Sequence, residues 1–192
     1  MVTINSNTNN ELIIKNSKFI GYLYKVSSIE EIELLLEKTR KNHKDATHVC
    51  YAYRIENKEK CSDDGEPTGT AGAPIMDILE KNDITNVLAI VVRYFGGTLL
   101  GAGGLIRAYS KTIREALKLT TLEEIVFYNY YELKANYDDL KLLNTLTKDL
   151  NIITKDFGEL ITYKIKIEKD LDSINELFKN TNIEILPIIP EE

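Results

Sequence analysis

The chain has 192 residues, of which 43% are hydrophobic and 28% are charged. This composition is typical of a globular protein and excludes a disordered or collagen-like chain. The longest uninterrupted apolar run, residues 87–92, is too short for a transmembrane helix, which needs about 20 residues. The first residues are polar and lack the layout of a signal peptide, so we expect a cytoplasmic protein without a membrane partner.

The net charge of −6 is unevenly distributed, and this predicts two domains. Residues 1–120 carry 16 basic and 15 acidic side chains, whereas residues 121–192 carry 8 basic and 15 acidic ones. All five arginines lie in the first part. We therefore expect an α+β protein with one domain over residues 1–121 and a second over residues 122–192.

The first domain is predicted to begin with two strands and a helix. Residues 12–14 and 18–26 are typical of strands, and Asn16-Ser17 forms the turn between them. Ser27 or Ser28 can cap a helix that follows, because apolar residues recur there at helical spacing.

Residues 47–55 predict a strand with two different faces, because their side chains alternate in character. One face carries Val49, Tyr51, Tyr53 and Ile55, and the other carries His48, Cys50, Ala52 and Arg54. Residues 56–73 are rich in Gly, Asp and Pro, which favour turns, so we expect a loop there.

The remainder of the first domain predicts a helix, a buried strand and a second helix. Pro74 suits the first turn of a helix that extends to about residue 82. Residues 86–95 are apolar in the middle, which indicates a strand buried on both faces. A glycine-rich stretch over residues 96–104 precedes a long helix that ends near residue 119.

The pattern restarts after residue 121 and predicts the order β-α-β-β-α-β. The expected strands cover residues 125–134, 152–157, 160–168 and 183–189, and the expected helices cover residues 137–150 and 171–179. This order is that of a ferredoxin-like sandwich, in which two helices cover one face of a four-stranded antiparallel sheet.

The strand, glycine-rich stretch and helix over residues 93–111 form a candidate anion site. Glycines let backbone N–H groups approach a ligand, and the start of a helix carries partial positive charge. No Asp or Glu occurs from residue 84 to residue 114. The candidate residues for anion or nucleic-acid binding are Arg93, Gly96, Gly97, Gly101, Gly103, Arg107 and Lys111. The alternative is that the glycines only let the helix pack tightly; the spacing fits neither a Walker loop nor a dinucleotide fingerprint.

A second candidate site combines Asp63, Asp64 and Glu66 with His48 on the neighbouring strand. Three carboxylates within four residues could hold a divalent cation or act as acid and base. The alternative is a structured turn, in which Asp side chains accept backbone N–H groups. His48 and Cys50 share a strand face and could join such a site, or they could be a packed histidine and a buried thiol. We expect the structural reading and assign no catalytic residue and no metal ligand.

Three motifs in order resemble the YigZ/IMPACT protein family. They are THVCYAY at residues 47–53, SDDGEPTGTAG at residues 62–72, and GAPIMDILEKNDITNVLAIVVRYFGGTLLG at residues 72–101. The second domain is similar to the C-terminal domain of the bacterial members, which resembles the last domain of elongation factor G.

The resemblance implies a fold and a class of function. The first domain would have the α+β superfold shared by a ribosomal protein domain, elongation factor G domain IV and the GHMP kinases. The eukaryotic relative is a translation regulator, and the family has no established catalytic residues. We therefore expect a non-enzymatic, ribosome-associated protein that binds RNA or a translation factor, with no cofactor. The alternatives are a metal-dependent hydrolase or phosphotransferase that uses the Asp63-Asp64-Glu66 loop, and a protein–protein adaptor.

Overall fold

The computed structural model describes residues 1–189 and shows a protein of mixed α and β structure with two compact units. The first unit covers residues 1–125, and the second begins at Val126. The predicted boundary after residue 121 lies in front of strand β7 (Leu122–Glu124), which pairs with strand β1 (Val2–Ile4). The first unit therefore ends about four residues later than predicted, at Ile125.

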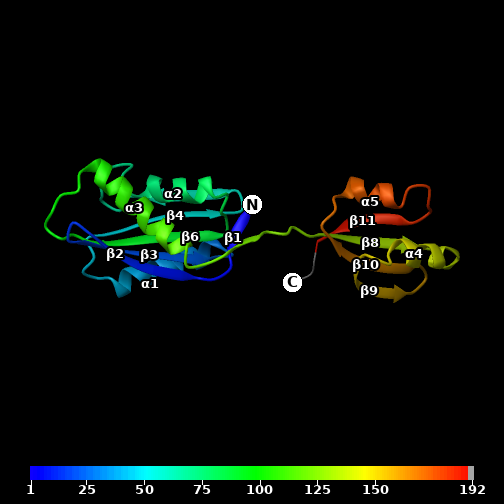
Figure 1. Ribbon diagram of the computed structural model, residues 1–192. Helices are drawn as coiled ribbons and strands as arrows, with labels where there is room; N and C mark the ends of the chain where they lie inside the picture. Colours follow the sequence, from blue (N-terminus) through cyan, green and yellow to red (C-terminus); the bar gives the residue numbers. More distant parts are fainter. Residues whose placement is uncertain (190–192) are drawn as a thin grey trace. The chain divides into compact units, whose positions relative to one another are not determined.

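The first unit is built on a five-stranded antiparallel sheet with the strand order β2-β3-β6-β4-β5 (Figure 1). Its strands are β2 (Thr8–Ile14), β3 (Ser17–Lys25), β4 (His48–Ile55), β5 (Lys58–Ser62) and β6 (Val87–Tyr94). β6 lies at the centre, and seven of its eight residues are buried. This confirms the prediction of a strand that is covered on both faces.

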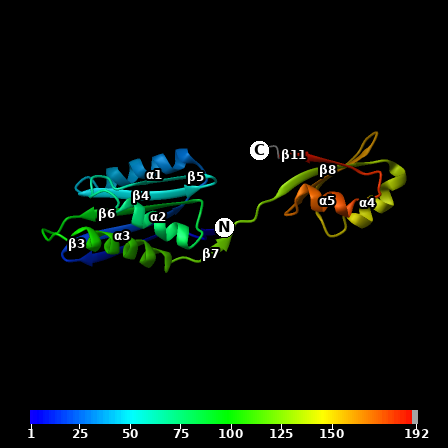
Figure 2. The same ribbon diagram turned by 90° about the horizontal axis from the view of Figure 1, so that it is seen from above.

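Helices cover both faces of this sheet, with α1 on one face and α2 and α3 on the other (Figures 1 and 2). The helices are α1 (Ile29–Asn42), α2 (Gly72–Lys81) and α3 (Ala102–Leu117). The Ser28 side chain caps α1 by accepting the backbone N–H of Glu31 at 3.1 Å. Of the two serines proposed as caps, Ser28 therefore occupies the capping position.

The two faces of β4 carry the residues that the alternation predicted. Val49 and Ile55 belong to the core under α1. Cys50 and Ala52 belong to the larger core on the opposite face, under α2 and α3. The side of the sheet that faces α2 and α3 therefore receives His48 and Arg93, which are paired in the β4–β6 register.

The loop predicted over residues 56–73 is wrong in its first part, because Lys58–Ser62 forms β5 and pairs with β4. Its sequence, KEKCS, has neither the alternation nor the apolar residues of a typical strand. An edge strand needs only one hydrogen-bonded neighbour, and the exposed charged side chains of β5 remain in water.

The second unit contains the predicted order β-α-β-β-α-β, with a four-stranded antiparallel sheet in the order β11-β8-β10-β9. Its elements are β8 (Asn129–Ala135), the 3-10 helix η1 (Tyr137–Asp139), α4 (Leu140–Leu146), β9 (Asn151–Phe157), β10 (Ile161–Ile167), α5 (Leu171–Leu177) and β11 (Glu184–Ile188). Leu143 of α4 and Ile174 of α5 enter one core with the inward side chains of β8 and β10.

Across residues 1–189, none of the helices combines the length and the apolar character that crossing a membrane requires.

We expect residues 126–192 to fold when they are expressed alone, because the unit buries its own core, in which Leu133, Leu143 and Ile165 are completely buried. Urea denaturation followed by circular dichroism should show one cooperative transition. An aggregated fragment, or one without such a transition, would contradict the independence of this unit.

Candidate functional site

A cavity of about 410 Å³ lies in the first unit, between the loop after β5 and the loop after β6. Its polar lining includes His48, Glu66 and Arg93, which come from β4, the loop after β5 and the end of β6. Its apolar lining includes Pro67, Phe95, Leu99, Leu100 and Leu105. The cavity therefore unites residues from both candidate sites that the sequence suggested.

A buried ion pair beside this cavity joins the loop after β5 to strand β6. The Nη1 of Arg93 lies 2.6 Å from the Oε1 of Glu66, and the side chains are only 6% and 3% exposed. Arg93 also donates weakly to the Oγ of Ser17, with Nη2 at 3.4 Å. Arg93 therefore pairs with Glu66, and this ion pair connects the loop after β5 to the central strand β6.

Tyr109 and Cys50 extend this polar cluster into the core. The Tyr109 hydroxyl donates to the Oε1 of Glu66 at 2.7 Å, and the Cys50 thiol lies 3.4 Å from that hydroxyl. Burial raises the pKa of Tyr109, and burial also raises the pKa of Cys50 to about 12. Both groups stay protonated at neutral pH, so the Cys50 thiol lacks the thiolate form that nucleophilic chemistry requires.

The loop that presents Glu66 is shaped by a tight turn. The backbone N–H of Glu66 donates to the carbonyl of Asp63 at 3.0 Å, and Asp64 and Gly65 have φ angles of 43° and 85°. These left-handed conformations at two successive positions reverse the chain. The reversal directs Glu66 toward Arg93.

The three carboxylates of the loop contact different partners. Asp63 accepts the backbone N–H groups of Gly69, Ala71 and Gly72 at 2.8–2.9 Å. Asp64 accepts the N–H of Val49 at 2.7 Å and pairs with Arg40 at 3.0 Å. Since Glu66 pairs with Arg93, the carboxylates do not converge on one point.

Hydrogen bonds outweigh burial at both aspartates, from backbone N–H groups at Asp63 and chiefly from Arg40 at Asp64. Burial raises the pKa of Asp63, but the three N–H donors outweigh it and leave the pKa below its ordinary value. Burial likewise raises the pKa of Asp64, and Arg40 with the Val49 N–H brings it below the ordinary value. Each carboxylate is therefore ionised at neutral pH and holds nearby structure in place.

His48 has one ring nitrogen fixed by a hydrogen bond, and within residues 1–189 the other has no hydrogen-bond partner. Its Nδ1 lies 2.8 Å from the carbonyl oxygen of Asp64. A carbonyl only accepts hydrogen bonds, so Nδ1 carries a proton. The Nε2 lies 3.9 Å from the Oε1 of Glu66, beyond hydrogen-bonding distance, and His48 lines the cavity.

The predicted glycines have different structural roles. A side chain at Gly96 would collide with the backbone of Asn16 and Ser17, so this glycine permits close packing of two loops. Gly101, with φ 71°, provides the left-handed residue before α3. Gly97 also has a positive φ, and Gly103 lies in the first turn of α3. Packing thus accounts for Gly96, and backbone conformation accounts for Gly97 and Gly101.

Arg107 and Lys111 are exposed and lie apart from the buried Arg93. They line a smaller cavity of about 230 Å³, together with Lys15 in the turn after β2. Of the residues predicted to bind an anion together, Arg93 is instead buried and paired with Glu66, so the structure does not bring it to the surface with Arg107 and Lys111. Leu100 lines both cavities and marks where they adjoin.

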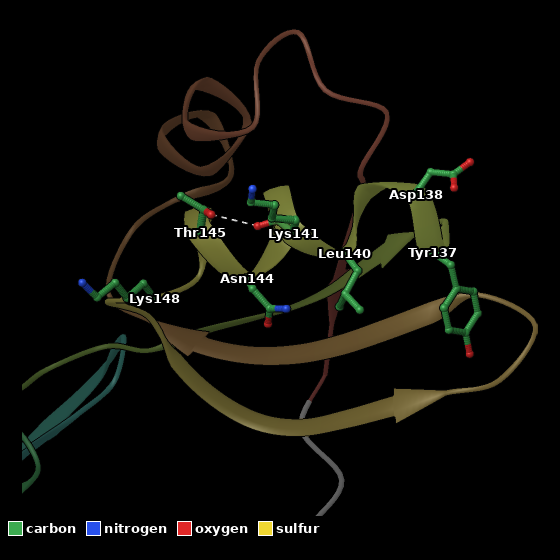
Figure 3. A pocket seen from close by; sticks show the side chains of 7 residues that line it. All are labelled: Tyr137, Asp138, Leu140, Lys141, Asn144, Thr145 and Lys148. Carbon is green, nitrogen blue, oxygen red and sulfur yellow. Dashed lines mark hydrogen bonds between the residues drawn. The ribbon is translucent and has the colours of Figure 1, made fainter.

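The second unit has a larger hollow, which is lined by one continuous stretch of the chain (Figure 3). It has a volume of about 640 Å³, and all its lining residues come from the single stretch 137–148. Thr145 donates to the carbonyl of Lys141 at 2.8 Å, and Tyr137 donates to the carbonyl of Gly158 at 3.0 Å. The first bond lies within α4 and the second ties η1 to the turn after β9, whereas the cavity of the first unit contains a buried ion pair.

Sequence reasoning missed two members of the cluster, Tyr109 and Arg40. Tyr109 lies four residues from Leu105 and from Ile113 on α3, so its position on the apolar face of the helix could have been found from helical spacing. Arg40 gives no such signal, because its contact with Asp64 depends on where the end of α1 meets the loop.

Glu66→Leu should destabilise the first unit by about 3–5 kcal/mol, because the Arg93 charge would remain buried without a partner. Combining it with Arg93→Met should recover most of that loss. Urea unfolding of the two single variants and the double variant measures this coupling. Additive losses in the double variant would show that the ion pair does not act as a unit.

Asp63→Asn should cost about 1.5–3 kcal/mol at pH 7, because charged hydrogen bonds to three N–H groups are weakened. The folded-state pKa of Asp63 is lowered, so its stabilising effect is present above the ordinary value of about 3.9 and is lost as pH falls through the lowered value. Urea unfolding at pH 7, 5 and 3 should show the wild-type advantage shrinking at the lowest pH. Asp45→Asn, at an exposed position, is the control, and equal effects of the two variants at pH 7 would contradict the prediction.

Comparisons with known proteins agree with the motifs. Residues 15–117, more than half of the chain, match the Impact N-terminal domain family. IMPACT family member YvyE of Bacillus subtilis (strain 168) is 41% identical over 138 residues, which are 70% of this chain and 64% of that protein, so the match spans less than two thirds of this relative. IMPACT family member YigZ of Escherichia coli (strain K12) is 36% identical over 138 residues, 69% of this chain and 68% of that protein.

A solved structure extends the likeness to both units. The crystal structure of a hypothetical protein is 29% identical, with a TM-score of 0.68, and covers 99% of this chain and 98% of that chain. The matched domain contains β6 with Arg93, the loop after β5 with Glu66, and α3 with Tyr109. From the domain match and these relatives, the chain belongs to the IMPACT family.

Proposed function

We propose that this protein is a non-enzymatic regulator of translation that binds RNA, or an RNA-containing part of the translation machinery, through α3. The observation that carries this proposal is the α3 stripe, which we define as Arg107, Lys111 and Arg114. All three residues are exposed, and they recur at spacings of four and three on the helix. Within residues 1–189, no carboxylate forms an ion pair with any of them.

The surroundings of the stripe favour an anionic partner. No acidic residue occurs in the first turn of α3, and Lys15 joins Arg107 and Lys111 around the adjoining cavity. The stripe covers two helical turns, about 10 Å, so it presents several cations to a polyanion. RNA offers phosphates along an extended strand, and each contact releases condensed counterions, which supports binding despite the net charge of −6.

The family relation supports the link to translation. The resemblance to the eukaryotic IMPACT protein implies a regulator of translation. We further propose that the first unit has the superfold shared with elongation factor G domain IV and the GHMP kinases. For the second unit we propose a ferredoxin-like sandwich similar to the last domain of elongation factor G. The cytoplasmic location remains a prediction.

The alternative functions draw less support from the geometry. A metal-dependent hydrolase would need the carboxylates of the loop to converge, but Asp63, Asp64 and Glu66 contact different partners. A protein–protein adaptor would use the acidic second domain, and this alternative becomes the conclusion if the α3 stripe proves irrelevant to RNA binding.

Replacing Arg107 and Lys111 together by Gln should weaken RNA binding and reduce its dependence on salt. Two lost contacts predict that the slope of log K against log salt falls by about 1.4, at roughly 0.7 per phosphate on a single strand. Binding to single-stranded RNA and to ribosomes should be measured over a salt series.

The matched control replaces Lys38 and Lys44 by Gln. These exposed lysines lie on α1 and just after it, on the other face of the sheet (Figure 2). The control removes the same charge and should retain the wild-type slope. Identical slopes for the two double variants would remove the α3 stripe from the function and favour the adaptor.

A further inference from the structure

The cavity beside the Glu66–Arg93 pair presents hydrogen-bond acceptors that the protein leaves unused. The Glu66 Oε1 receives bonds from Arg93 and Tyr109, whereas its Oε2 accepts none from residues 1–189. The side chain of Glu66 is only 3% exposed, and it lines the cavity. His48 offers a second acceptor, because the tautomer that its Nδ1 contact selects has a lone pair on Nε2.

These two acceptors restrict the chemistry of an occupant. A purely apolar group would bury both acceptors without partners, which is unfavourable. A cation would lose its hydration in exchange for little attraction, because Arg93 already neutralises Glu66 at 2.6 Å. The polar side of the cavity therefore suits a neutral group with two N–H donors.

The rest of the cavity suits a flat, largely apolar ring. Phe95 is 45% exposed and Leu99 is 84% exposed, and both line the cavity with Leu100 and Pro67. Aromatic and apolar side chains of this kind stack on the faces of unpaired bases, whose edges are read by hydrogen bonds. A volume of about 410 Å³ is within the range of small-ligand pockets.

We propose that this cavity binds a guanine base. Guanine carries adjacent donors, the N1–H and the 2-amino group, which can donate to the Glu66 Oε2 and the His48 Nε2. Uracil offers one donor on the corresponding edge, and adenine offers one amino group beside an acceptor. The base can come from a free guanosine nucleotide or from an unpaired guanosine of RNA. The free nucleotide would bind without the α3 stripe, so the proposal goes beyond the proposed function.

The test is calorimetric titration of the full chain with guanosine, inosine and uridine 5′-monophosphates. Guanosine monophosphate should bind with one site per chain. Inosine monophosphate lacks only the 2-amino group and should bind about tenfold more weakly, the loss expected for one hydrogen bond to a base edge. Equal binding of guanosine and inosine monophosphates, or no binding of any of the three at millimolar concentration, would overturn the proposal.

Two matched variants show where the nucleotide binds. Ala102→Leu adds volume at an exposed residue that lines the cavity, so it should abolish binding of guanosine monophosphate. Ala73→Leu makes the same change at an exposed residue in the first turn of α2, outside the cavity, and should leave binding unchanged. Thermal unfolding verifies that both variants are folded. Unchanged binding by Ala102→Leu would place the nucleotide elsewhere and refute the proposal.

The source of the base is distinguished with RNA. A uridine-rich strand that contains one guanosine should bind more tightly than the same strand with inosine if the cavity accepts an RNA base. If guanosine is preferred over inosine in the mononucleotides and not in the RNA strands, the ligand of the cavity is a free nucleotide. The variant with Gln at positions 107 and 111 should keep its binding of guanosine monophosphate, so failure of the RNA-binding proposal and failure of the guanine proposal remain distinguishable.

Discussion

The ion pair between Glu66 and Arg93 is the interaction on which the arrangement of the first unit depends. Two opposite charges at 2.6 Å, both almost completely buried, stabilise each other because they have lost most of their hydration. The pair connects the central strand to the loop after β5, and Tyr109 connects α3 to the same carboxylate. Three segments that are far apart in the sequence thereby meet at one oxygen atom.

This geometry divides the charges of the first unit into two groups with different physical behaviour. The buried pair is neutral as a whole and is little screened by salt, so its attraction persists at high ionic strength. The α3 stripe is exposed and strongly screened, so it acts on a partner only through several simultaneous contacts. Leu100 lines the cavities beside both groups, so the two kinds of charge lie on adjoining hollows.

The sequence was sufficient for the elements with clear periodicity and insufficient for the contacts between loops. The alternation of Val49, Tyr51, Tyr53 and Ile55 determined both faces of β4, and the order of the second unit followed from regular apolar spacing. β5 was missed because an edge strand needs no apolar face. The partner of Arg93 depended on a tight turn with two left-handed residues, and spacing in the sequence does not indicate which carboxylate such a turn directs inward.

The two edges of the five-stranded sheet are protected in different ways. On the β2 edge, Thr8 and Asn10 donate to carbonyl groups of α3 at 3.1 Å, so the helix is fastened along that strand. On the other edge, β5 exposes Lys58, Glu59 and Lys60. A second chain that added a strand there would have to bring its own backbone against these charges, which disfavours edge-to-edge aggregation. The charged residues that made β5 hard to predict as a strand therefore also prevent other chains from pairing with this edge of the sheet.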